Sequence, residues 1–87
     1  MSKFSAEVTV MLKPVVNDPQ GLVIHSSLQQ LGFAGVESVR VGKQIVIEVE
    51  ADSEQAAETE VRQMCEKLLR NPVIEDFSLT VRAAVPT

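Results

Sequence analysis

Apolar and polar residues alternate from Phe4 to Leu12, and this pattern constrains the fold more than any other feature of the chain. A period of two is typical of a strand that buries one face. Residues 45–50 and 77–82 alternate in the same way, and apolar residues recur at helical spacing in the segments between these strands. The order of strand and helix patterns along the chain predicts an α+β domain with helices packed on one face of an antiparallel sheet.

The first helical segment begins at Asp18-Pro19. Asp18 is a helix-capping residue type, and proline fits the first helical position because no N–H is needed there. Ile24, Leu28 and Leu31 then recur at helical spacing, which predicts the face that packs on the sheet.

The outer face of this helix is uncharged. No Asp, Glu, Lys or Arg occurs between Pro19 and Val36, and Leu22 projects nearly opposite the inner stripe. Lone exposed apolar residues are ordinary, so one interpretation is a neutral surface kept soluble by serine and glutamine. The other is that a second protein covers this face, since interface centres are depleted in charge.

Gly21 stands in the first turn of the predicted helix, where glycine costs about 1 kcal/mol relative to alanine. One explanation is close packing of this turn on the sheet. The alternative is that a position without a side chain lets a partner's backbone approach, with Gln20 supplying a donor and an acceptor.

The segment VESVRVGKQIVIEVEA predicts two strands joined by a hairpin turn at Gly42-Lys43. A second helix begins at Asp52 or Ser53 and ends at Asn71-Pro72. Its predicted inner residues are Ala57, Val61, Met64, Cys65 and Leu68. With a last strand over residues 77–82, the order is βαββαβ. This order predicts a single ferredoxin-like domain over residues 1–87, with two helices on one face of a four-stranded antiparallel sheet.

The composition of the chain argues against several classes of function. The net charge of −4, without a basic cluster, argues against nucleic-acid binding, because neutralising phosphates requires clustered Lys and Arg. No apolar run approaches the length of a membrane helix, and the single cysteine fits a cytoplasmic location. His25 lacks neighbouring metal ligands, and Cys65 falls on the inner stripe of the second helix, where cysteine is usually an apolar filler. We therefore expect no catalytic, cofactor-binding or metal-binding residues in this chain.

Four motifs carry a resemblance to a known family: DPQG at 18–21, LGF at 31–33, VRVGK at 39–43 and CEKLLRNPVIEDF at 65–77. They resemble PurS, the small subunit of phosphoribosylformylglycinamidine (FGAM) synthase, over residues 8–81. Two positions depart from the family pattern, which usually has leucine at Asn17 and often tyrosine at Phe77.

The resemblance implies a subunit of an ATP-dependent C–N ligase of purine biosynthesis that takes its amido group from glutamine. It implies a homodimer or higher homo-oligomer that bridges a glutaminase subunit and a large synthetase subunit and assists ammonia transfer between them. ATP and Mg belong to the large subunit, and the small one is not known to carry catalytic groups. The expected partner-interface residues are Asp18, Gln20, Gly21, Leu22, Arg40, Gly42, Lys43, Asn71 and Pro72.

Two other functions share the predicted fold. A ligand-sensing domain of the ACT type has the same element order and often places glycine in the first strand-to-helix loop. An acylphosphatase-like enzyme needs an arginine in that loop, where this chain has only Lys13 as a cation. The ACT-like domain is therefore the stronger alternative.

Overall fold

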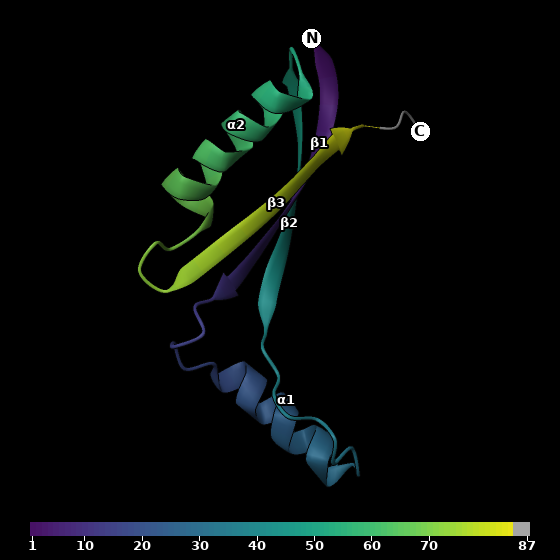
Figure 1. Cartoon of the computed structure of the whole chain (residues 1–87), viewed down its shortest axis with the longest axis vertical. Helices are drawn as coiled ribbons and strands as arrows, with labels where there is room; N and C mark the ends of the chain where they lie inside the picture. The colour runs from purple at the N-terminus through teal and green to yellow at the C-terminus, as the bar shows by residue number, and fades with distance from the viewer. Residues whose placement is uncertain (85–87) are drawn as a thin grey trace.

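The computed structural model describes residues 1–84 as an α+β chain with a sheet, two α-helices and one π-helical turn. In chain order the elements are β1 (Ser2–Leu12), α1 (Pro19–Gln30), β2 (Gly42–Ala51), α2 (Glu54–Met64), η1 (Cys65–Leu69) and β3 (Glu75–Ala83). Figure 1 shows that they form two parts. The sheet carries α2 on one side, whereas α1 lies beyond the end of the sheet.

The sheet has three antiparallel strands in the order β2-β1-β3. In the central strand the alternation predicts the buried face correctly: Phe4, Ala6, Val8 and Val10 are buried. Their neighbours across the sheet face the same way. Val8 lies opposite Ile45 of β2 and Leu79 of β3, and both pack against the core.

Helix α2 covers this apolar face. The Ser53 hydroxyl accepts a hydrogen bond from the Ala56 N–H at 3.1 Å, so Ser53 is the N-cap. Ala57, Val61 and Cys65 are fully buried against the sheet, which confirms most of the predicted inner stripe.

The prediction of the inner stripe is wrong at its last residue, Leu68, because α2 continues into a π-helical turn. The Arg70 N–H donates to the carbonyl oxygen of Cys65 at 3.1 Å, which is the wider hydrogen-bond ring of a π-helix. The wider turn changes the phase of the helix. Leu69 therefore packs against the core, and Leu68 points outward with 82% of its surface exposed.

The prediction of a fourth strand and of a hairpin turn at Gly42-Lys43 is wrong. Gly42 is the first residue of β2, where it pairs with Met11, and the segment before it is irregular. The physical reason is that this segment is held elsewhere. The N–H of Val41 donates to the side chain of Asp18, and the carbonyl of Val39 faces Gly21.

The two helices also do not share one face of the sheet. Residues 13–41, called the arm below, leave the sheet at the end of β1, form α1, and return to the start of β2 (Figure 1). The predicted inner residues Ile24 and Leu31 are 43% and 73% exposed, and Gly21 is the only buried residue of α1. The remaining elements are called the body.

The arm makes the chain extended. The radius of gyration is 16.7 Å, whereas a compact chain of this length would have about 12 Å. The accessible surface is 6262 Å², against about 5,000 Å² for a compact monomer of this mass. The excess of roughly 1,200 Å² is surface that a compact fold of this size would bury.

The π-turn predicts unequal effects at two neighbouring leucines. Leu69→Ala should lower the free energy of unfolding by about 1–3 kcal/mol, because it removes partly buried core contacts. Leu68→Ala is the matched control and should change it by less than about 0.5 kcal/mol. Urea unfolding measures both, and equal losses at the two positions would contradict the observed phase.

Candidate functional site at the base of the arm

The carboxylate of Asp18 joins the two chain segments that meet at the base of the arm. Its Oδ1 accepts a hydrogen bond from the Gly21 N–H at 2.9 Å, which confirms Asp18 as the N-cap of α1. Its Oδ2 accepts a second from the Val41 N–H at 2.8 Å. The hydrogen bonds from Val41 and Gly21 hold the pKa of the Asp18 carboxyl below its ordinary value, with Arg40 adding to the effect and burial opposing it. Asp18 is therefore a buried, ionised tie between the first helix and the return segment.

Arg40 ties the return segment to the segment that leaves β1. Its Nη2 donates to the carbonyl oxygens of Leu12 and Lys13 at 3.0 and 2.9 Å, and its Nη1 donates to that of Pro14 at 3.3 Å. Its Nε lies 3.9 Å from Oδ2 of Asp18. The guanidinium thus satisfies three carbonyl groups where the chain leaves β1.

At both Gly21 and Gly42, another part of the backbone lies so close that a side chain would not fit. A Cβ on Gly21 would overlap the carbonyl oxygen of Val39, and one on Gly42 would overlap Met11 and the carbonyl oxygen of Val10. Backbone atoms cannot move aside as side chains do. Gly21 therefore lets the first turn of α1 lie against the return segment of its own chain, not against the sheet.

An open hollow with a volume of about 380 Å³ lies beside these residues. Its polar lining comes from Asp18, Gln20, Lys43 and Glu75, and Val10 and Leu12 contribute part of its apolar lining. Of the predicted interface residues, six meet here: Asp18, Gln20, Gly21, Arg40, Gly42 and Lys43.

The other three predicted residues lie apart from this cluster. Leu22 is on α1 with 58% of its surface exposed. Asn71 and Pro72 belong to the turn between η1 and β3, where the side chain of Asn71 accepts a hydrogen bond from the Val73 N–H at 2.9 Å. This turn is fastened to the arm, because the Lys13 N–H donates to the carbonyl oxygen of Ile74 at 2.8 Å.

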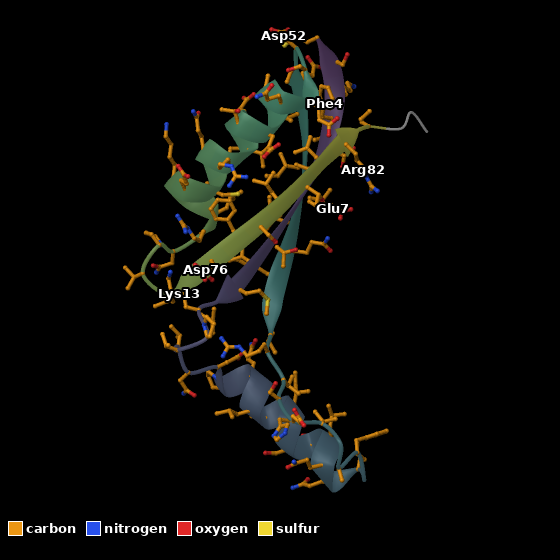
Figure 2. The ribbon with its side chains drawn as sticks, in the orientation of Figure 1. Phe4, Glu7, Lys13, Asp52, Asp76 and Arg82 are labelled. Atoms are coloured by element: carbon orange, nitrogen blue, oxygen red, sulfur yellow. The ribbon has the colours of Figure 1, made fainter. Side chains whose placement is uncertain are left out.

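Sequence reasoning missed the residues that complete the site. Lys13 forms an ion pair with Asp76 at 3.0 Å where the arm leaves the sheet (Figure 2). His25 Nε2 lies 2.9 Å from the carbonyl oxygen of Val36, and this contact fastens α1 to the return segment. No local motif points to either pair, because the partners are 63 and 11 residues apart in the sequence.

The described residues show little reactive chemistry. Burial raises the pKa of the Cys65 thiol, although Arg62 and Arg70 act against this shift, so the thiol stays protonated at neutral pH. Among residues 1–84, no group of three or more His, Cys, Asp or Glu side chains is placed to hold a metal ion. Over the same residues, no helix is long and apolar enough to cross a membrane.

Comparison with known proteins identifies the family. The model of the PurS family, described as phosphoribosylformylglycinamidine (FGAM) synthase, matches residues 5–83. The chain belongs to the PurS family. It is thus a subunit of an ATP-dependent amidotransferase ligase of purine biosynthesis, and this membership decides against the ACT-like and acylphosphatase-like alternatives.

Two curated PurS subunits show the extent of the similarity. The protein from Archaeoglobus fulgidus is 44% identical over 77 residues, which cover 88% of this chain and 96% of that protein. The protein from Synechocystis is 41% identical over 80 residues, which cover 92% of this chain and 80% of that protein. Both are phosphoribosylformylglycinamidine synthase subunits.

Solved structures share the arrangement of arm and body. The structure of PurLQS from Thermotoga maritima matches with a TM-score of 0.87 at 34% identity, covering 94% of this chain and all of the matched one. PurS from Methanocaldococcus jannaschii, a subunit of formylglycinamide ribonucleotide amidotransferase, matches with a TM-score of 0.84 at 38% identity, covering 94% and 99%. Scores this high require a similar placement of the arm, which makes up a third of the chain.

The close approach at Gly21 predicts the effect of adding one methyl group. Gly21→Ala should lower the free energy of unfolding by about 1–3 kcal/mol, because a backbone carbonyl blocks the new Cβ. Gly35→Ala is the control, since nothing lies within 4 Å of its Cβ position and its φ is not positive. Thermal and urea unfolding measure both. Stabilisation by Gly21→Ala would show that the first turn does not need glycine.

Proposed function

We propose that this chain is the non-catalytic small subunit of FGAM synthase and that it holds the glutaminase and synthetase subunits together while ammonia passes between them. The observation that carries the proposal is the uncharged stretch of the arm over residues 19–36, where apolar side chains are exposed. Leu22, Val23 and Phe33 are 58%, 66% and 57% exposed. A surface of this kind is suited to contact with other proteins.

The proposed partners follow from the same surface and from the family. PurLQS of Thermotoga maritima contains a chain similar to this one. By that likeness we infer that this chain binds a glutaminase and a large synthetase in the cytoplasm. ATP and Mg are bound by the large subunit in this proposal, and no cofactor is bound by the small one.

The excess surface also fits self-association. A standard interface buries about 800 Å² on each partner, and this chain exposes roughly 1,200 Å² more than a compact monomer. The outer edge of β2, beside which the fourth strand was expected, is covered by no described strand, and such an edge pairs readily with other chains. We therefore infer a homodimer or higher homo-oligomer. In it, a neighbouring copy covers the sheet edge that the expected fourth strand would have covered.

The exposed predicted residues are proposed as direct contacts. They are Gln20, Leu22, Gly42, Lys43, Asn71 and Pro72. They extend from α1 past the hollow to the turn before β3, so one partner surface that follows the base of the arm would meet most of them.

Reconstitution tests the proposed function. Glutaminase and synthetase subunits are mixed with and without this chain, and FGAM formation is measured with glutamine or with ammonia as the nitrogen source. We expect glutamine-dependent synthesis to require the chain and ammonia-dependent synthesis to need it much less. Equal glutamine-dependent rates without the chain would reject the proposal.

A charge on the arm should weaken assembly without unfolding the chain. Leu22→Glu places a carboxylate in the proposed contact surface and should weaken self-association by at least about tenfold, or about 1.4 kcal/mol. Ser27→Glu is the matched control, because it adds the same charge at an exposed polar position of α1 that lies about 140° around the helix from Leu22. Sedimentation measures association and circular dichroism monitors the fold. If both variants associate like the parent chain, the Leu22 face is not a contact surface.

A further inference from the structure

The arm is joined to the body by two short crossings of the chain, one after Leu12 and one before Gly42. Asp18 and Arg40, called the latch below, bind these crossings to each other. Asp18 accepts hydrogen bonds from Gly21 and Val41, and Arg40 donates to three carbonyl groups over residues 12–14. The latch therefore ties the start of α1, the exit from β1 and the entry to β2 at one point.

Neither latch side chain is well placed to meet a partner. Asp18 is 7% exposed, and both of its oxygens already accept hydrogen bonds. The Arg40 side chain is 33% exposed, and its two terminal nitrogens already donate to carbonyl oxygens. Binding a partner through either group would first require breaking these contacts.

Other restraints on the direction of the arm are weaker. The ion pair between Lys13 and Asp76 is solvent-exposed at 3.0 Å, and exposed pairs contribute about 0–1 kcal/mol. The Lys13 N–H also donates to Ile74, but that bond fixes only the first residue of the arm. Helix α1 adds little, because Gly21 is its only buried residue.

We propose that Asp18 and Arg40 are positioning residues that set the direction in which the arm leaves the sheet, and so control assembly without touching the partner. This inference rests on the proposed function, since it takes the arm to be the adhesive surface. The sequence predicts that these two residues contact a partner directly. The proposal gives them an indirect role instead. Without the latch, the arm samples many directions, and the apparent affinity falls in proportion to the fraction that remains competent.

The body has a separate source of stability. Its two core clusters are built around Val8, Val61 and Cys65 and around Phe4 and Ala57, and neither includes a latch residue. Loss of the latch should therefore free the arm and leave the body folded, which makes the two effects separable by experiment.

The test compares Asp18→Asn and Arg40→Met with Arg82→Met. The control breaks an exposed ion pair with Glu7 at 3.1 Å, on the sheet and away from the arm (Figure 2). Hydrogen exchange of β1 and α2 reports the body. Spin labels at Gln29 and Glu60, both exposed, report the direction of the arm, with labelled copies diluted into unlabelled chain. Sedimentation and glutamine-dependent FGAM synthesis report assembly.

We expect the latch variants to broaden the distance distribution between the labels and to weaken assembly by about tenfold, as a competent fraction of about one tenth would give. Exchange in the body should stay as in the parent chain, and Arg82→Met should change none of the readouts. The double variant should be no worse than the more affected single one, because the two residues act as one unit.

Three results would overturn the inference: unchanged assembly, a narrow parental distance distribution in a variant that assembles poorly, or additive losses in the double variant. If a variant loses protection from hydrogen exchange in the body, Arg40→Lys is tested in its place. Lysine keeps the positive charge but lacks the planar fork that binds several carbonyl groups at once. A broad distribution with a protected body then supports the inference, and a narrow one refutes it. Failure of the parent chain to assemble would reject the proposed function instead.

Discussion

The pair of hydrogen bonds that the Asp18 carboxylate accepts is the interaction on which the arrangement of the arm depends. One bond caps α1 and the other holds the residue just before β2, so a single side chain sets both where the helix starts and where the chain re-enters the sheet. A charged carboxylate accepts N–H bonds more strongly than a neutral group does. The Asp18 carboxylate is ionised at neutral pH, and these hydrogen bonds hold its pKa below the ordinary value.

The close contact of backbone at the same point depends on this tie. The carbonyl of Val39 lies where a side chain at position 21 would stand, so glycine is needed for the carboxylate to reach both N–H groups. Arg40 then satisfies the carbonyl groups that the departing strand leaves without sheet partners. The Val41 N–H, which would pair with a neighbour in the expected fourth strand, is instead bound by a side chain at the base of the arm.

Short-range patterns predicted the body well. Alternation along β1, β2 and β3 gave the correct buried faces, and Asp18-Pro19 gave the correct start of α1. The arm was not predictable in this way. The spacing of Ile24, Leu28 and Leu31 shows that a helix has an apolar side, but not which surface covers it. The hydrogen bond from Val41 to Asp18 and the π-turn before Arg70 depend on tertiary geometry that no local motif encodes.

The distribution of charge distinguishes the arm from the body. The chain carries a net charge of −4, yet residues 19–36 contain no charged side chain, so the acidic residues are concentrated in the body. The negative charge of the body opposes contact with another negatively charged surface, because like charges oppose association. The uncharged stretch lies on the part of the chain that projects beyond the sheet, so a partner can reach it without facing the acidic body (Figure 1). The direction of the arm therefore decides whether its apolar surface is presented away from the acidic body, which is why a fixed direction matters for the proposed assembly.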